Sequence, residues 1–254
     1  MLLRVESLTK QFDGLIAVNK VSFDVNKGEI LAIIGPNGAG KSSIFNLISG
    51  SLHPTSGNII MREEGITGLS PHAIARKGVA RTFQTTSLFD QLRVADNLAI
   101  GHKMRTSGGF WSTLLHAGPW KEDKEKTTAK IMDILSFIGL AGKANNFVST
   151  LSQEEQKRLA IGVALAGSPQ IILLDEPTGG LIQEETDGIT VLIRKIKAAG
   201  VTVCLIEHKM RMVMDLADRI IVLNYGEKLA EGSPLEISSN PEVIEAYLGR
   251  EYVA

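Results

Sequence analysis

Cysteine is almost absent from this chain of 254 residues, in which Cys204 is the only example. A single cysteine cannot form an internal disulfide, so no disulfide framework holds the fold. Cys204 lies within the apolar run of residues 201–206. We therefore expect a small core residue there and not a nucleophile.

Long hydrophobic runs and an excess of one charge are also missing. No apolar stretch approaches the roughly 18 residues that cross a bilayer, and residues 1–5 lack the charged start and apolar middle of a signal peptide. The formal net charge is -1, from 27 Lys and Arg against 28 Asp and Glu. This balance leaves no basic footprint for nucleic acid and no polybasic patch for a membrane. We expect a cytoplasmic protein that binds no nucleic acid.

Hydrophobic residues make up 44% of the chain, which is ample for a core in one large domain or in one domain with an inserted lobe. Residues 2–5, 21–25 and 58–61 read as half-buried antiparallel strands. Helical signals then take over from about residue 84 to 167, including apolar residues at i, i+3, i+4 and i+7 over residues 131–138. The sequence therefore predicts an α/β core interrupted by a helical lobe.

The core pattern resumes after residue 167. Ile189, Leu192, Ile193 and Ile196 share one helix face, and Gly200 ends that helix. Strands follow over residues 201–206 and 219–223. Between the two core parts, residues 101–126 mix Gly, Ser, Trp and charges. A docking surface is one interpretation of this stretch, and a solvated loop with a short helix is the one we favour.

A glycine-rich segment carries the strongest chemical signal. It has the pattern Gly-x4-Gly-Lys-Ser, follows the apolar run 30–34 and opens an apolar helix. In that setting backbone N–H groups surround phosphates, Lys41 neutralises the outer phosphates and the Ser42 hydroxyl can hold Mg²⁺. An ordinary Gly-rich turn is the alternative. The predicted phosphate-binding residues are Gly35, Pro36, Asn37, Gly38, Ala39, Gly40, Lys41, Ser42 and Ser43.

Two carboxylates end a second apolar run, at residues 171–177. The run reads as a buried parallel strand, and ligands gather at the carboxyl ends of such strands, so Asp175 is expected to face the Mg²⁺ held by Ser42. Glu176 is then placed to orient or deprotonate an attacking water. Alone, the pair could be solvated strand-end carboxylates. Beside the phosphate loop, it predicts nucleotide hydrolysis.

These segments resemble the ATP-binding subunits of ABC transporters. The glycine-rich loop, Phe83-Gln84, Leu151-Ser152, the 171–177 run and Ile206-Glu207-His208 occur in that family's order and span nearly the whole chain. Residues 12–15, 18–19, 78–84 and 241–249 resemble, more narrowly, the ATPase subunits of branched-chain amino-acid importers.

The resemblance implies an ABC ATPase fold, which is a P-loop core with an antiparallel β subdomain and an inserted helical subdomain. Residues 1–83 and 168–232 correspond to the core with its β subdomain, and residues 84–167 to the helical subdomain. Residues 233–254 correspond to a C-terminal helical tail. The implied cofactors are ATP and Mg²⁺.

The resemblance also assigns roles to single residues. Phe12 matches the aromatic that stacks on adenine, although such a residue is as often core, and Val18 falls in the same nucleotide-binding segment. Gln84 matches a loop glutamine that reaches Mg²⁺ or water. His208 matches a switch histidine that holds the γ-phosphate and positions the water of Glu176. Arg81 and residues 87–94 are implied to lie near the contact with the membrane partner.

The signature segment, residues 151–158, departs from the family pattern. In the family this helix start contacts the nucleotide of the other subunit, so Ser152, Gln153, Glu154 and Glu155 would face the partner's ATP, with Glu154 in place of a glycine. Two unit charges about 5 Å apart at an effective dielectric of about 20 repel by roughly 3 kcal/mol, unless the side chains turn away. Ser152 and Glu155 also form a capping-box pattern, which favours the helix itself.

A second departure is Ile182, where the family has Asp or Asn. Together the two departures suggest a chain that keeps its own ATP half-site but offers a poor signature to its partner. Such a chain would pair with a non-identical ATPase subunit, although a homodimer stays open. A variant or engineered sequence would explain the departures equally.

The resemblance implies an ATP hydrolase that drives separate transmembrane permease subunits from the inner face of the plasma membrane. A solute receptor outside the cell would act indirectly, and it would choose the solute together with the permease. Two alternatives stay open. One is a nucleotide-gated module with little hydrolysis of its own, and the other is an ABC ATPase outside transport.

Overall fold

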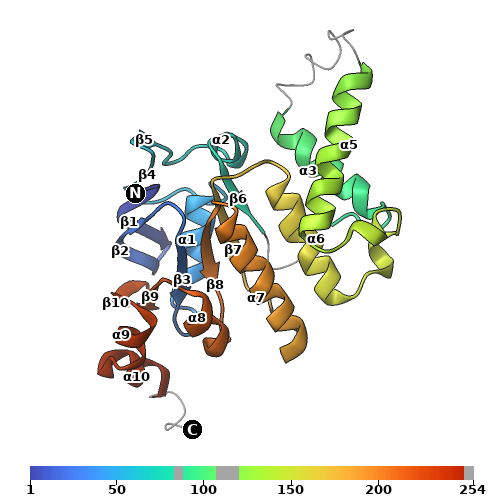
Figure 1. Cartoon of the computed structure of the whole chain (residues 1–254). Helices are drawn as coiled ribbons and strands as arrows, with labels where there is room; N and C mark the ends of the chain where they lie inside the picture. The colour runs from blue at the N-terminus through green and yellow to red at the C-terminus, as the bar shows by residue number, and fades with distance from the viewer. Residues whose placement is uncertain (83–87, 107–119, 249–254) are drawn as a thin grey trace.

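The computed structural model describes residues 1–82, 88–106 and 120–248 (Figure 1). Two sheets with α1 between them form one end of the molecule, and a group of helices (α3, α5 and α6) stands apart at the other end. Gln84 lies outside the described residues.

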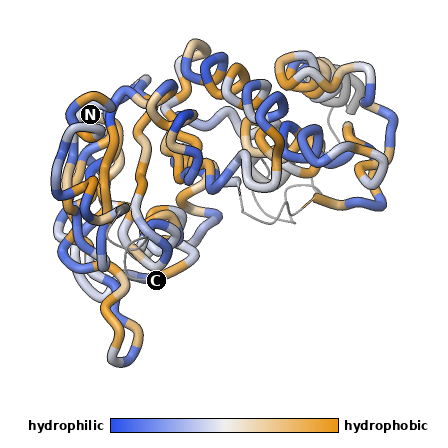
Figure 2. The backbone as a smooth tube through the Cα atoms, turned by 90° about the horizontal axis from the view of Figure 1, so that it is seen from below, coloured by the Kyte–Doolittle hydropathy of each residue, from blue (hydrophilic) through white to orange (hydrophobic). Residues whose placement is uncertain are grey.

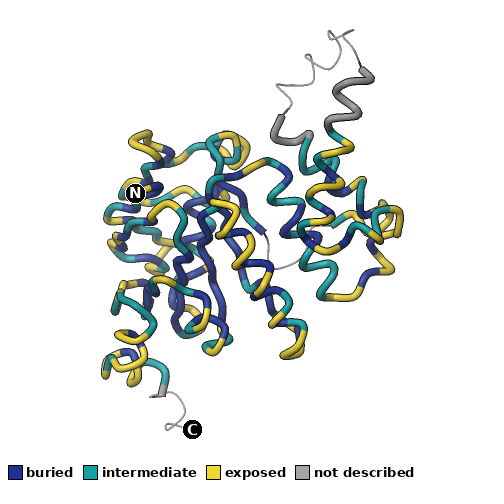
Figure 3. Tube along the Cα trace, in the orientation of Figure 1, coloured by how far each residue is buried: buried dark blue, intermediate teal, exposed yellow. Residues whose placement is uncertain are grey.

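The larger sheet has the strand order β10-β9-β3-β8-β7-β6. All neighbours are parallel except β10, which pairs with β9 in the antiparallel sense. The central strands are buried along their whole length, which explains their continuous apolar sequences (Figure 3). The strands are β3 (Ile30–Ile34), β6 (Val79–Arg81), β7 (Ile171–Asp175), β8 (Thr202–Ile206), β9 (Arg219–Asn224) and β10 (Glu227–Gly232).

The smaller sheet is antiparallel, with the order β2-β1-β4-β5. Its strands alternate buried and exposed residues, as the sequence predicted, but β1 and β2 are longer than expected because register shifts carry their pairing to residue 12. The strands are β1 (Leu3–Phe12), β2 (Leu15–Val25), β4 (Ser56–Met61) and β5 (Glu64–Gly65). Their buried side chains pack with α1 (Lys41–Ile48) in one core cluster.

Helices α3 (Val94–Thr106), α5 (Trp120–Phe137) and α6 (Gln153–Leu165) pack on one another, and α6 also contacts β6 and β7 of the larger sheet. Hydrophobic and hydrophilic residues are interspersed along the backbone (Figure 2). In α5 and α6, the buried residues Ile131, Leu135, Leu159 and Ile161 belong to one core cluster. The predicted helix over residues 131–138 is confirmed, and Gly139 follows it with a φ of 78°. Short 3₁₀ turns at Ala141–Lys143 and Val148–Thr150 lead into α6.

The interpretation of residues 101–126 as mainly a loop is wrong at both ends, because α3 runs to residue 106 and α5 begins at residue 120. Gly101, which the sequence analysis counted among the loop-favouring residues, lies within α3. A Cβ built on it would lie 2.8 Å from Cγ1 of Val163 on α6. The glycine therefore allows two helices to approach closely and does not mark a turn.

The remaining helices cover the larger sheet. Helix α7 buries Ile189, Leu192, Ile193 and Ile196, as predicted, and ends before Gly200. Cys204 is fully buried in β8, where burial raises the pKa of its thiol. In the part of the chain that the structure describes, no helix is both long and apolar enough to cross a membrane. The helices are α2 (Pro71–Arg76), α7 (Gln183–Ala198), α8 (Met210–Leu216), α9 (Pro234–Ser238) and α10 (Pro241–Leu248).

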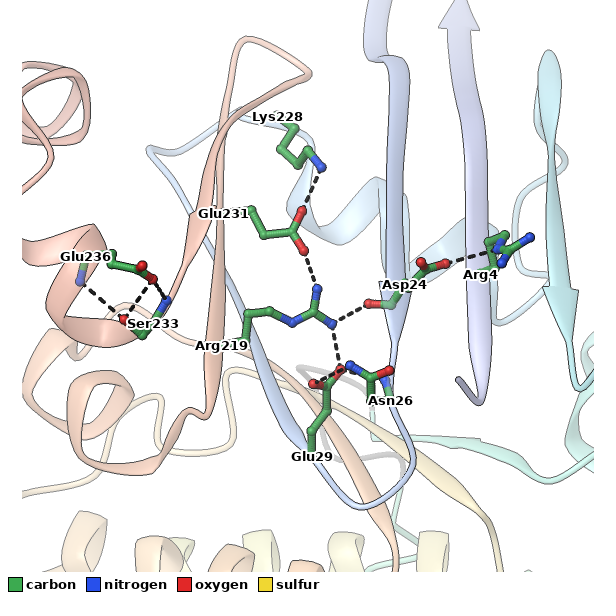
Figure 4. A network of polar contacts seen from close by, with 9 residues as sticks. All are labelled: Arg4, Asp24, Asn26, Glu29, Arg219, Lys228, Glu231, Ser233 and Glu236. Carbon is green, nitrogen blue, oxygen red and sulfur yellow. Dashed lines mark hydrogen bonds and ion pairs between the residues drawn. The ribbon is translucent and has the colours of Figure 1, made fainter.

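A polar network around Arg219 joins the two sheets (Figure 4). The guanidinium of Arg219 donates to Oε1 of Glu29 at 2.7 Å and to the carbonyl of Asp24 at 2.6 Å, and it also pairs with Glu231. Asp24 belongs to β2, Glu29 precedes β3, and Arg219 and Glu231 lie on β9 and β10. Arg219 begins β9, so the network lies at the amino ends of the parallel strands, opposite the phosphate loop.

Candidate nucleotide-binding site

The glycine-rich loop connects β3 to α1 at the carboxyl edge of the larger sheet, as predicted. Gly40 precedes α1 with a φ of 98°, and a Cβ built on it would lie 2.4 Å from the carbonyl oxygen of Ala17. Gly35 is equally constrained, because its Cβ would lie 2.2 Å from the carbonyl oxygen of Leu223. Glycine is therefore needed at both ends of the loop, where its backbone packs closely against that of Ala17 and Leu223.

Lys41 lies beneath this loop with only 6% of its surface exposed. Its ammonium donates to the carbonyl oxygens of Gly35 at 2.7 Å and Pro36 at 2.9 Å. Burial lowers the pKa of Lys41, while the negative charges of Glu176 and Asp175 oppose that shift. The Lys41 ammonium group is therefore held at the loop, close to the carboxylates of Asp175 and Glu176.

Asp175 ends β7 and is 3% exposed. Its Oδ2 accepts a hydrogen bond from Nη2 of Arg81 at 2.9 Å, in a buried ion pair. Arg81 also donates from Nη1 to Asn46 at 2.6 Å and to Ser49 at 3.0 Å, both near the end of α1. Arg81 thus fixes Asp175 against α1. The resemblance assigned Arg81 only to the transporter contact, and its pairing with Asp175 was missed.

A divalent cation fits the residues present. Oδ1 of Asp175 is buried and accepts no hydrogen bond from the residues that the structure describes. A carboxylate oxygen of this kind is a hard ligand of the type that Mg²⁺ prefers. Ser42, at the start of α1, offers an exposed hydroxyl. Among the described residues no group of three or more His, Cys, Asp or Glu lies close enough together to hold a metal ion.

Glu176 and His208 meet across the ends of β7 and β8. Nε2 of His208 lies 3.0 Å from Oε1 of Glu176. Glu176 has a φ of 48°, an uncommon conformation for a residue other than glycine, which turns its side chain out of the strand direction. The two residues expected to position an attacking water are therefore in direct contact.

Phe12 and Val18 have different surroundings. Phe12 ends β1 with 41% of its surface exposed, and Nζ of Lys10 lies 4.9 Å from its ring centroid. The aromatic ring is accessible, as an adenine-stacking role requires. Val18 is fully buried in the core cluster beside α1, so its assignment to the nucleotide stays a prediction.

The signature segment forms the predicted capping box at the start of α6. Oγ of Ser152 accepts a hydrogen bond from the N–H of Glu155 at 3.3 Å, and Glu155 in turn accepts one from the N–H of Ser152 at 3.0 Å. Lys143 forms an ion pair with Glu155. Burial alone would raise the pKa of Glu155. The hydrogen bonds from Lys143 and Ser152 and the charges of Lys143 and Arg158 outweigh this effect, so the pKa of Glu155 is lower than its ordinary value.

Glu154 turns aside from the helix start. Its Oε1 accepts hydrogen bonds from Nε of Arg158 at 2.7 Å and pairs with Nη2 of the same residue at 2.6 Å. The same oxygen lies 2.8 Å from a Cβ built on Gly188 of α7. Both acidic side chains are thus neutralised within the chain, which weakens the repulsion expected from the sequence. Gln153 packs against Gly180, at 2.5 Å from a Cβ built there.

Ile182 immediately precedes α7 and is 65% exposed. Its N–H donates to Glu185 at 3.1 Å, but its side chain has no polar atom. In the coupling segment, residues 88–94 are described, with Phe89 54% exposed, whereas residue 87 lies outside the described part.

Comparison with known proteins agrees with this geometry. The sequence profile described as "ABC transporter" matches residues 18–179. The chain belongs to the ABC transporter family. A second profile, "Branched-chain amino acid ATP-binding cassette transporter", matches residues 227–253.

Relatives cover the ABC transporter chain almost completely. It is 41% identical over 249 residues to the high-affinity branched-chain amino acid transport ATP-binding protein LivG of Salmonella typhimurium, covering 98% of each. It is 40% identical to BraF of Pseudomonas aeruginosa at the same coverage.

Solved structures confirm the ABC ATPase fold. The ADP conformation of MJ1267, an ATP-binding cassette of an ABC transporter, matches with a TM-score of 0.86 and 32% identity, covering 98% of each chain. A dimeric post-hydrolysis state of the cassette MJ0796, bound to ADP and Pi, matches with a TM-score of 0.76 and 26% identity over 92% of this chain and 99% of that one.

Proposed function

We propose that this ABC ATPase powers the import of branched-chain amino acids by binding and hydrolysing Mg-ATP and moving separate permease subunits. The printed names of its full-length relatives support the solute. The observation that carries the chemistry is the 3.0 Å contact between Glu176 and His208 at the edge of the sheet that holds the glycine-rich loop.

Binding of the triphosphate falls to the loop between β3 and α1. Its N–H groups and Lys41 stabilise negative charge on the phosphates, and the positive end of α1 adds to this field. Ser42, Asp175 and Gln84 would hold Mg²⁺, which supplies charge neutralisation at the phosphates when it is bound. Phe12 stacks on the adenine through its exposed face.

Hydrolysis is assigned to Glu176 and His208. The Glu176 carboxylate orients the attacking water and accepts its proton, while His208 holds the γ-phosphate and keeps the Glu176 side chain in place through Nε2. Arg81 holds the Asp175 side chain in place through an ion pair. Asp175 would therefore bind Mg²⁺, while the neighbouring Glu176 would act on the attacking water.

The partners follow from the same proposal. Ser152, Gln153, Glu154 and Glu155 would face the nucleotide of a second ATPase subunit, identical or not. We propose that Phe89 and its neighbours in residues 88–94 contact the permease at the inner face of the plasma membrane, because Phe89 is 54% exposed. We further propose that residues 84–167 act as the inserted helical subdomain, that residues 1–83 and 168–232 form the core, and that residues 233–254 form the tail.

Substitution of the proposed base tests this function. Glu176→Gln keeps the size of the side chain but removes the base, so we expect hydrolysis to fall by about 10³-fold while ATP binding is retained. Phosphate release and nucleotide affinity are measured for the full chain assembled with its transporter partners. The matched control is Glu184→Gln, at an exposed carboxylate in the first turn of α7.

Unchanged turnover in Glu176→Gln would remove this residue from its role. The same assay separates the alternative of a nucleotide-gated module, because an ATPase is stimulated by its membrane partner whereas a pure gate releases no phosphate in either condition. Lys41→Ala gives a third result, since it is expected to lose nucleotide affinity itself.

A further inference from the structure

A buried carboxylate lies directly behind the proposed catalytic pair. Glu207 follows β8 and is only 2% exposed. Its Oε1 accepts hydrogen bonds from the N–H groups of His208 at 3.1 Å and Lys209 at 3.4 Å. Its Oε2 accepts one from the N–H of Thr178 at 3.3 Å. One side chain therefore holds the backbone of both segments that carry the catalytic side chains.

A second link runs between the same two segments. Nζ of Lys209 donates to the carbonyl of Leu181 at 2.7 Å and to Oγ1 of Thr186 at 2.7 Å. Leu181 lies in the turn between Glu176 and α7, and Thr186 lies in the first turns of α7. The segments 176–181 and 207–209 are thus joined at three places, by the pairs 176–208, 178–207 and 181–209.

The relative placement of the Glu176 and His208 side chains depends on how the two loops that carry them are held. The contact between Glu176 and His208 involves side chains on two different loops, and Glu176 holds a strained backbone conformation. A displacement of about 1 Å at reacting groups can lower a rate by about a hundredfold. Hydrogen bonds to a carboxylate are stronger than hydrogen bonds between two neutral groups, so they hold the donor N–H groups more firmly.

The charge of Glu207 is also compensated locally. Lys157 on α6 lies within the field of Glu207, Glu176 and Asp175, and its Nζ donates to the carbonyl of Glu176 at 3.4 Å. Lys157 therefore ties the backbone at Glu176 to α6, beside the segment that Glu207 holds.

We infer that Glu207, supported by Lys209, is a positioning residue that holds His208 in register with Glu176 for ATP hydrolysis. This inference rests on the roles proposed above for Glu176 and His208. Glu207 itself touches neither nucleotide phosphates nor the attacking water in this assignment. It acts through the backbone of the two loops.

Glu207→Gln tests the inference with little change in shape. An amide has one accepting oxygen, and its NH₂ group faces an N–H donor, so one of the two loops must lose its anchor. We expect kcat for ATP hydrolysis to fall by about 10- to 100-fold. We expect the KM for ATP to change by less than about threefold, because the phosphate loop is untouched. Both are measured with the full chain assembled with its transporter partners.

A double substitution separates positioning from general destabilisation. In the His208→Ala background, Glu207→Gln is expected to lower kcat by less than about twofold more, because its effect passes through His208. The matched control is Asp218→Asn at the opposite edge of the sheet, where Oδ2 of Asp218 accepts a hydrogen bond from the N–H of Ile30 at 2.7 Å. We expect the Asp218→Asn control to lower the melting temperature of the protein and to leave kcat unchanged.

The outcomes are distinct. If Glu176→Gln and His208→Ala lower turnover strongly, to a residual rate that can still be measured, but Glu207→Gln keeps the wild-type rate, the positioning role is overturned and the proposed function stands. A full additional loss in the His208→Ala background overturns it too. If Glu176→Gln and His208→Ala retain wild-type turnover, both proposals fail. Should Glu207→Gln not fold, Lys209→Met decides: reduced kcat at constant KM supports the inference, and unchanged kcat contradicts it.

Discussion

At the scale of single residues, the pair of Arg81 and Asp175 shows how a charged side chain is tolerated in the core. Both are nearly inaccessible, with side-chain exposures of 8% and 3%, and the guanidinium also satisfies Asn46 and Ser49. A buried ion pair adds little net stability over apolar residues, yet removal of one partner leaves an uncompensated charge. Arg81 therefore determines how the Asp175 side chain is oriented.

Arg81→Met should destabilise the chain strongly for this reason. We expect a loss of about 3 kcal/mol in the free energy of unfolding, measured by urea denaturation at pH 7. The matched control is Arg76→Met, at an exposed arginine of α2, with an expected change within about 0.5 kcal/mol. Equal denaturation midpoints for the two variants would contradict the role given to Arg81.

At the scale of elements, the start of α6 combines two functions. The capping box of Ser152 and Glu155 closes the helix start, and the ion pairs of Glu155 and Glu154 fix both acidic side chains. The segment that would face the partner's nucleotide is therefore already occupied by bonds within its own chain. These bonds stabilise the start of α6 at the position where the family pattern has a glycine.

The capping box predicts a pH-dependent contribution of Glu155. Its pKa in the folded chain is below the ordinary value of 4.5, so the stabilisation is present above pH 4.5 and is lost as the pH falls through the lower folded value. Gln can keep the capping hydrogen bond but lacks the charge at the helix start and the ion pair with Lys143, so Glu155→Gln should lower the free energy of unfolding by about 0.5 to 1 kcal/mol at pH 7.

Denaturation curves at pH 7 and at stepwise lower pH check this. The gap between wild type and Glu155→Gln should close as the solution is acidified. Glu245→Gln, at an exposed position of α10, serves as the control and should show no gap. A gap that widens toward low pH would show that the carboxylate does not stabilise the folded chain.

At the scale of the whole molecule, the described residues proposed for this chain's own ATP site lie together, whereas those proposed to face the partner's ATP depart from the family pattern. Lys41, Asp175, Glu176 and His208 gather at one edge of the sheet, while the signature segment carries acidic residues and Ile182 lacks a polar side chain. A dimer of this chain with a non-identical ATPase subunit would thus have one strong and one weak composite site.

Single-site turnover in the reconstituted pair measures this asymmetry. With the base of each subunit replaced in turn, we expect the site that uses this chain's signature segment to turn over at least about tenfold more slowly than the other. The comparison of the two half-inactivated pairs is its own control, because each contains one substitution. Similar rates at both sites would rule out the asymmetry.

The sequence predicted local features well and pairings between distant residues poorly. The glycine-rich loop, the strand ending in Asp175 and the capping box are each contained in a few consecutive residues with their own physical pattern. Arg81 and Asp175 are 94 residues apart, and Thr178 and Glu207 are 29 apart, so no local pattern marks either pair. Glu207 did carry one signal, since it directly follows the apolar strand β8 and precedes another polar residue.

The position of β3 in the larger sheet has a consequence for biosynthesis. Ile30 pairs with Val203 of β8, and Leu31 with Arg219 of β9, so the central strand has no neighbour in its sheet until the last part of the chain leaves the ribosome. Such long-range pairing slows folding and leaves an apolar strand unprotected during translation. Completion of the sheet around β3 is therefore a late step in folding, and the phosphate loop gains its contact between Gly35 and Leu223 only when β9 has docked.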